Sequence, residues 1–170
     1  NAPISSVDNI TYYFTGNIYD SIVVERDMIV VDGDGYTLYG SGSGTGMDLS
    51  HRNNVTIKNM QIKEFDYSIY LYNSSIISIR ENNMANNNIA VYLFHSSSTN
   101  ISENDMMNNG DGPWLRYSSN NTISGNNIAN NWGGILLFAS SNNTLARNNL
   151  LNNQYGIRLS GSSENTLISN

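Results

Sequence analysis

The sequence predicts an all-β fold, a single-stranded parallel β-helix (a solenoid) with 22-residue coils and three short strands in each coil. Three observations predict it. Apolar and polar residues both recur in columns with a 22-residue period, without an insertion from about residue 47 to residue 170. Each unit contains three short apolar segments that alternate with period two, such as Ile69-Tyr70-Leu71, and pairs of Asn or Ser separate them. Segments this brief suit strands bounded by turns, and three of them leave no residues for helices.

Residues 1–46 fit the period less well, and we expect them to form an N-terminal cap and the first, irregular coils. The segments ITYYF at 10–14, SIVVE at 21–25 and MIVVDGDGYTLYG at 28–40 have the composition of strands. The run GSGSGTG at 40–46 is expected to be a turn or surface loop and not a domain linker, because regular coils resume at once. Terminal units of a solenoid are usually atypical and cap its core.

Residues 47–170 are predicted to form the regular coils of the same continuous domain. Successive coils stack about 4.8 Å apart, so the members of one column lie on top of one another. Inward apolar columns then fill the core. The clearest of these columns are Ile57, Ile79, Ile101, Ile123, Leu145 and Leu167, and Leu49, Leu71, Leu93, Leu115, Leu137 and Leu159.

The asparagine and serine columns have structural explanations. A coil turns sharply between its sheets, often through left-handed αL conformations, which Asn tolerates better than most residues. A stacked Asn also forms amide hydrogen bonds with the Asn one coil away. The columns are Asn82, Asn104, Asn126, Asn148 and Asn170; Asn86, Asn108, Asn130 and Asn152; Asn87, Asn109, Asn131 and Asn153; and Ser74, Ser96, Ser118, Ser140 and Ser162.

The last residues, ENTLISN at 164–170, contain only the first strand of a coil. We therefore expect an open sheet edge there, which either further sequence or a neighbouring molecule covers. An open edge templates pairing with another chain.

The composition excludes several classes of function. The 170 residues suffice for one domain, and a net charge of −6 with eight Lys and Arg gives no electrostatic footprint for nucleic acid or an anionic membrane. No apolar run is long enough to span a bilayer. There is no cysteine and hence no disulfide.

The motif VDGDGYTLYGSGSGTGMDLSHRNNVTIKNMQI, followed by NN-T-I-x-x-NN repeats, resembles the NosD-like parallel β-helix repeat family, a branch of the pectate-lyase-like superfamily. The resemblance covers nearly the whole chain and implies a right-handed helix. The family is abundant in archaeal secreted and surface-layer-type proteins. Its members include polysaccharide lyases and hydrolases, a periplasmic copper-delivery factor and non-enzymatic surface proteins. The resemblance is therefore specific for fold and much less so for function.

Two pairs of carboxylates are candidates for chemistry. Glu81 and Glu103 share a column and so are expected about 5 Å apart on neighbouring coils, where they would bind a cation or act as acid and base. Asp32 and Asp34 in VDGDG form the densest acidic pair, at a turn for which glycines supply unusual φ values. For both pairs a purely structural role in turns is the simpler interpretation, and we expect no catalytic residue.

Metal and cofactor sites are not expected either. His51 and His95 share a column but lie two coils apart, roughly 10 Å, which is too far for one metal ion. Met84 and Met106 belong to an inward column and are expected in the core.

Six N-x-S/T sequons are candidate N-glycosylation sites that would suit a surface protein. A chain this rich in Asn, Ser and Thr contains about this number by chance, so the count is not informative. The sequons begin at Asn9, Asn54, Asn73, Asn100, Asn120 and Asn142.

An outward aromatic face is the feature that the core does not explain. Because Ile69 and Leu71 point inward, their neighbours in the strand point outward. The predicted face contains Tyr70, Tyr72, Tyr92, Phe94, Trp114, Leu136 and Phe138. Soluble monomers rarely leave such a patch bare, so the N-terminal segment or a loop covers it, or it contacts protein or sugar.

The sequence thus favours a non-catalytic, extracellular structural protein at the cell surface, which self-assembles into a surface layer, sheath or filament through stacked coils and the aromatic face. The partner would be further copies of the chain. The alternative is a carbohydrate-binding or polysaccharide-degrading β-helix that uses the same face. A sugar site needs a cleft with charged groups beside the aromatic rings, and Arg116 and Arg158 are the charged residues in those columns.

Overall fold

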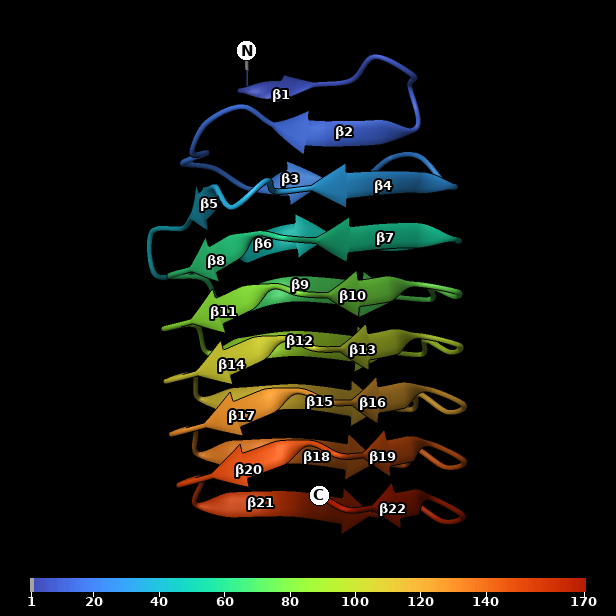
Figure 1. Cartoon of the computed structure of the whole chain (residues 1–170). Helices are drawn as coiled ribbons and strands as arrows, with labels where there is room; N and C mark the ends of the chain where they lie inside the picture. The colour runs from blue at the N-terminus through green and yellow to red at the C-terminus, as the bar shows by residue number, and fades with distance from the viewer. Residues whose placement is uncertain (1) are drawn as a thin grey trace.

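The chain folds into a stack of β-strand coils that runs from the N-terminus at one end to the C-terminus at the other (Figure 1). The computed structural model describes residues 2–170. Each regular coil contributes one strand to each of three sheets, named here A, B and C in the order in which the chain visits them. Over residues 2–170 there is no helix, and so none that is long and apolar enough to cross a membrane. The predicted all-β parallel β-helix is confirmed.

The three sheets have nine, six and seven strands. Sheet A contains β1 (Ile4–Ser5), β2 (Thr11–Phe14), β4 (Ile29–Asp32), β7 (Val55–Lys58), β10 (Ser78–Arg80), β13 (Asn100–Ser102), β16 (Thr122–Ser124), β19 (Thr144–Ala146) and β22 (Thr166–Ile168). Sheet B contains β5 (Thr37–Tyr39), β8 (Gln61–Lys63), β11 (Asn83–Ala85), β14 (Asp105–Met107), β17 (Asn127–Ala129) and β20 (Asn149–Leu151). Sheet C contains β3 (Ile22–Val23), β6 (Thr45–Asp48), β9 (Tyr67–Tyr72), β12 (Ile89–Phe94), β15 (Asp111–Arg116), β18 (Gly133–Phe138) and β21 (Tyr155–Ser160).

The 22-residue period of the sequence is the register of the sheets. From β6 to β19 every strand pairs in parallel with the equivalent strand of the next repeat, as Met47 does with Ile69. The earlier coils differ in length from the regular ones. Thr11 pairs with Val30, 19 residues along the chain, which is less than the period. Ile29 pairs with Val55, and Thr37 pairs with Gln61, so both of these steps along the chain exceed the period. The spacing is therefore irregular where the sequence departs from the repeat.

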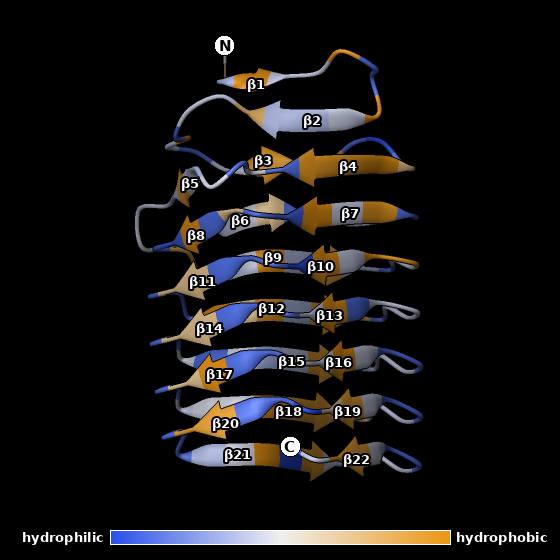
Figure 2. Cartoon of the chain, in the orientation of Figure 1, coloured by the Kyte–Doolittle hydropathy of each residue, from blue (hydrophilic) through white to orange (hydrophobic). Residues whose placement is uncertain are grey.

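The inward columns form a continuous apolar core. Ile57, Ile79, Ile101 and Ile123 in sheet A are completely buried, and so are Met84 and Met106 in sheet B, as predicted. Orange apolar segments therefore repeat at the same place in each coil in Figure 2. Each such side chain contributes about 1.5–3 kcal/mol by leaving water, so the stack gains stability with every coil.

The corners between sheets contain a recurring two-residue motif. At most corners of the regular coils one exposed residue has positive φ, and a buried Asn or Ser follows it. In Asn108-Asn109, for example, Asn108 has a φ of 58° and is not buried, whereas Asn109 is buried. The two members of an Asn pair thus have different roles, which explains why the sequence uses so many of them. The other corners of the same coil are Glu103-Asn104, Tyr117-Ser118 and Asn120-Asn121.

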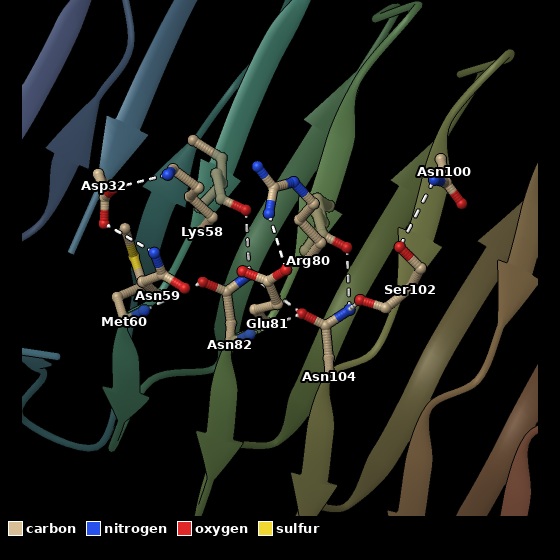
Figure 3. A network of polar contacts seen from close by, with 12 residues as sticks. Asp32, Lys58, Asn59, Met60, Arg80, Glu81, Asn82, Asn100, Ser102 and Asn104 are labelled. Atoms are coloured by element: carbon tan, nitrogen blue, oxygen red, sulfur yellow. Dashed lines mark hydrogen bonds and ion pairs between the residues drawn. The ribbon is translucent and has the colours of Figure 1, made fainter. Parts of the chain in front are cut away.

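The buried asparagines form the predicted ladders. The Asn104 Oδ1 atom accepts hydrogen bonds from the backbone N–H and the Nδ2 atom of Asn82, both at 3.0 Å. Its own Nδ2 atom donates to the carbonyl of Ile79 at 2.9 Å and to Oδ1 of Asn126 at 3.0 Å. Figure 3 shows Asn82 and Asn104 on successive coils, with hydrogen bonds between them. Each amide therefore links three coils.

The N-terminal strand β1 caps the stack. It pairs antiparallel with β2, so that Ile4 faces Phe14, and it lies above β2 at the end of sheet A (Figure 1). Residues 2–5 therefore do not cover sheet C, which argues against one of the alternatives for the aromatic face, that the N-terminal segment hides it. The VDGDG segment is the predicted turn, here between β4 and β5, and Gly35 has a φ of 80°.

Replacing Asn104 with Ala should cost about 2–5 kcal/mol of unfolding free energy, because it leaves buried donors of Asn82 and a buried carbonyl without partners. Urea denaturation measures the change. The matched control is Asn100→Ala in the same coil, an exposed residue whose Nδ2 atom reaches only Ser102 Oγ at 3.5 Å. The control should stay within about 0.5 kcal/mol of the parent chain. Equal effects of the two substitutions would contradict the ladder as a source of stability.

Candidate functional site

Sheet C carries the predicted aromatic face on its outer side. Parallel pairing places Tyr70, Tyr92 and Trp114 in one outward column, and Tyr72 and Phe94 in the next. We call these five residues the aromatic strip. The Tyr70 and Tyr92 rings lie 5.7 Å apart and stack, as do the Tyr72 and Phe94 rings. Burial raises the pKa of Tyr70, with smaller contributions from Tyr92 and Asp48, so its hydroxyl stays neutral at physiological pH.

The same columns continue into β18, where one prediction needs correction. Trp114 pairs with Leu136, and Arg116 pairs with Phe138. Phe138 is 40% exposed, as expected for this face, but Leu136 is only 8% exposed. Leu136 lies between Trp114 and Arg158 in its column, and the larger side chains around it remove it from water. It is part of the floor of a groove and not an exposed contact residue.

The groove lies on sheet C at the C-terminal end of the aromatic strip and has a volume of about 320 Å³, at the lower end of the range for small-molecule sites. Its main lining residues are Asp111, Trp114, Trp132, Leu136, Phe138 and Arg158. The position of Asp111 is explained by the column of residues that begins each sheet C strand. In that column Asp111 pairs with Gly133, and a Cβ atom at Gly133 would collide with the Asp111 carboxylate. The glycine therefore lets the carboxylate lie over β18.

Asp111 is the unusual charge of the groove. It is half-buried, and its Oδ1 atom is buried without a hydrogen-bond partner among residues 2–170. Burial raises the pKa of Asp111, and the nearby N–H of Gly133, which is bonded to the Gly110 carbonyl at 3.1 Å, opposes this only in part. A perturbed carboxylate in a cleft is a typical sign of a functional site.

Aromatic and cationic side chains surround this carboxylate. Trp132 is 47% exposed and meets Tyr155 edge-on at 5.0 Å. The Arg158 guanidinium lies 5.8 Å from the centre of the Tyr155 ring, within cation–π distance. The groove therefore combines two indole rings, one carboxylate and one guanidinium.

A second cation lies at the edge of the groove. Arg116 lies between three aromatic rings, 5.8 Å from Phe94 and 5.5 Å from both Tyr117 and Phe138. The Tyr92 hydroxyl, and after it the Tyr117 hydroxyl, raises the pKa of Arg116. Phe138 belongs both to this cluster and to the groove, so the two form one continuous surface.

The predicted carboxylate pairs lie elsewhere. Asp34, Glu81 and Glu103 line one open groove of about 660 Å³ with Asp105, a grouping that column spacing does not predict. Glu81 pairs with Arg80 at 2.8 Å. Residues 2–170 contain no group of three or more His, Cys, Asp or Glu that could hold a metal ion. This second groove is therefore acidic and solvated, and it has no defined metal or catalytic centre among the described residues.

Asp32, by contrast, has a structural role. It is only 6% exposed and forms an ion pair with Lys58 at 2.8 Å (Figure 3). Burial alone would raise the pKa of Asp32, but hydrogen bonds from Lys58, the Asp34 N–H and Asn59 outweigh it, and the pKa is lowered. The Asp32 carboxylate therefore holds the turn between β4 and β5 against the next coil.

All six sequon asparagines are exposed, and five of them have positive φ. Four of them lie at corners between sheets, whereas Asn9 lies in the connection between β1 and β2 and Asn100 lies in β13. Exposure is compatible with modification but is also what corner positions of a β-helix require. N-glycosylation at Asn9, Asn54, Asn73, Asn100, Asn120 and Asn142 therefore stays a prediction.

Sequence reasoning missed Asp111, Trp132 and Gly133. The signal was present in the column Tyr67, Ile89, Asp111, Gly133 and Tyr155, where a glycine interrupts a series of larger residues. The two columns that alternate with the core were considered, but this column, at the start of each sheet C strand, was not.

Comparisons with known proteins agree with the fold. The family model described as "Periplasmic copper-binding protein (NosD)" matches residues 21–170. The crystal structure of a point mutant of the periplasmic alginate epimerase AlgG superposes with a TM-score of 0.64 at 19% sequence identity, over 91% of this chain and 47% of that one. This chain thus spans about half the length of AlgG. None of the curated proteins matches the sequence.

The described residues do not fit the copper site that the family description implies. Copper takes imidazole, thiolate or thioether ligands, and the chain has no cysteine. The His51 ring packs edge-on against Tyr72, and the His95 ring stacks on Tyr117, both at 5.1 Å. The Met84 and Met106 sulfurs are in the buried core. We therefore derive no function through copper.

The pKa of Asp111 predicts a pH dependence of stability. An acid whose pKa is raised by folding binds more protons in the folded state, so stability falls as pH rises from the unfolded pKa, near 3.8, through the folded pKa, and stays lower above it. Asp111→Asn should remove this loss and raise Tm at pH 7, and it should have little effect below about pH 3.8. Thermal melts across this range measure the difference.

The control for this experiment is Glu103→Gln, which removes an exposed carboxylate from the same coil. As a surface substitution it should change the stability at pH 7 by less than about 0.5 kcal/mol. If the parent chain had a higher Tm than Asp111→Asn at neutral pH, the surroundings would stabilise the charged carboxylate, and this result would contradict the prediction.

Proposed function

The chain belongs to the NosD family of parallel β-helix proteins, and we propose that it binds a polysaccharide in the sheet C groove. The observation that supports the proposal is the presence of Asp111 and Arg158 beside Trp114 and Trp132 in one cleft. This is the combination that distinguishes a sugar site from a plain contact surface. Aromatic faces provide apolar contact for sugar rings, and a few polar groups fix their orientation.

The groove supports binding more directly than catalysis. Glycoside hydrolysis ordinarily uses two carboxyl groups on either side of the bond, whereas Asp111 is the single carboxylate among the groove-lining residues. AlgG is described as an alginate epimerase, which is consistent with a carbohydrate ligand for this fold but assigns no reaction to this chain. We assign binding alone.

The family description supports a location outside the cytoplasm. Its members are described as periplasmic, and we propose a periplasmic or extracellular location for this chain. Polysaccharides are available in both places.

Trp114→Ala and Trp132→Ala should each weaken polysaccharide binding by about tenfold or more, because each removes a large ring worth on the order of 2 kcal/mol of apolar contact. Native gel electrophoresis in gels that contain a soluble glucan, mannan, pectin or alginate measures this as lost retardation. Tyr13→Ala on β2 removes an exposed ring from sheet A and serves as the control. Retardation that survives both tryptophan substitutions would place the ligand elsewhere, and a parent chain that no polysaccharide retards would contradict the proposed function.

Self-association through the aromatic strip is a second candidate function. The observation that favours it is the flat stack formed by the rings of β9 and β12, which lies outside the groove. Flat, partly exposed aromatic surfaces of this kind are typical of protein contacts. The strip would join rods side by side into a layer, sheath or filament.

Tyr92→Asp should abolish such association, because it places a charge at the centre of the strip. Sedimentation velocity and electron microscopy over a concentration series measure the assembly of the parent chain and the variant. Tyr13→Asp on sheet A is the control and should leave assembly unchanged. A parent chain that remains monomeric at all concentrations would rule out this second function.

A further inference from the structure

The two charges of the groove have no ion-pair partner in the described part of the chain. The ion pairs of residues 2–170 are formed by Arg52, Lys58 and Arg80, and include neither Asp111 nor Arg158. The Asp111 Oδ1 atom also lacks a hydrogen-bond donor. Buried acceptors without partners are rare in native proteins, and this one leaves the negative charge of Asp111 poorly compensated by donors or water.

The surroundings of Asp111 make its charge the stronger of the two inside the groove. Asp111 is half-buried beside Leu136 and over Gly133, so water screens its charge poorly. Arg158 is exposed, and water and salt screen its charge more effectively. An anionic ligand would therefore meet repulsion from Asp111 that attraction to Arg158, and to the more distant Arg116 at the edge of the groove, only partly offsets.

We infer that the groove selects an uncharged sugar over a uronate. This inference rests on the proposed polysaccharide-binding function. A sugar hydroxyl both donates and accepts, so one hydroxyl donates to the accessible side of the Asp111 carboxylate while a neighbouring oxygen accepts from Arg158. The ionised carboxyl group of a uronate is an acceptor only and offers no donor to Asp111. Trp114 and Trp132 provide the apolar surface for the ring.

Gly133 is the residue that builds this selectivity. Because any Cβ atom there would collide with the Asp111 carboxylate, the glycine permits the half-buried position from which Asp111 acts. The φ of Gly133 is not in the positive range, so an alanine would fit the backbone; its Cβ would displace the carboxylate and press on the Leu136 methyl groups, 3.1 Å away. Gly133 and Asp111 together are specificity-determining residues.

The test compares oligosaccharides that differ only at C6. One pair is β-1,4-mannotetraose with the β-1,4-mannuronate tetramer, and the other is cellotetraose with the β-1,4-glucuronate tetramer. Isothermal titration calorimetry at neutral pH measures each Kd for the parent chain. In at least one pair the neutral sugar should bind about tenfold tighter than its uronate, the effect of losing one hydrogen bond to a charged group.

Asp111→Asn should bring the two affinities of that pair within about threefold of each other, because the repulsion is gone. Gly133→Ala should act in the same direction without changing any charge. Asp105→Asn on β14 removes a carboxylate from the same coil but not from the groove, and should leave the ratio unchanged. Uronates that bind as tightly as the neutral sugars, or tighter, would overturn the inference and leave the proposed function intact. If none of the four tetramers binds, the inference and polysaccharide binding at this groove both fail.

Discussion

The buried amide ladder is the interaction on which the rest of this structure depends. Asn82, Asn104, Asn126 and Asn148 link successive coils through their side chains, and they do so only when every coil has the same length. An insertion or deletion of one residue would break the ladder and turn every side chain of the following strand to the other face. The ladder therefore fixes the register, and the register places equivalent residues in columns. Each coil also shields the apolar core of the next, so specificity from the amides and stability from the core reinforce each other.

A fixed register leaves the outer face of the sheets free to vary. Inward strand positions are apolar, and in the regular coils most positions after a positive-φ corner residue hold a small buried polar residue. Outward positions have no such constraint, so the column that contains Tyr92 and Trp114 changes to Arg158 within three coils. The sheet C groove arises from this freedom, where a glycine in one column lets a carboxylate lie beside an aliphatic floor. The candidate site is thus a local departure from the repeat, supported by a scaffold that does not depart from it.

Coil length, strand positions, the core columns and the amide ladders could be predicted from the sequence, because each is repeated several times and the repeats confirm one another. The aromatic face could be predicted for the same reason. The groove could not, since it depends on how Asp111 packs on Gly133, and that pairing occurs once. The proximity of Asp34 to Glu81 and Glu103 in one groove could not be predicted from the sequence for a different reason. The coil that contains Asp34 is longer than the regular repeat, so column spacing does not carry across it.

The most direct test of the central claim uses the fluorescence of the two tryptophans. The chain contains only Trp114 and Trp132, and both line the groove, so their emission reports on this site alone. Titration of the parent chain with a soluble neutral polysaccharide should shift the emission to shorter wavelength and saturate, because the ligand removes water from both rings. Emission that does not change while the polysaccharide binds by another measure would contradict the assignment of the groove as the binding site.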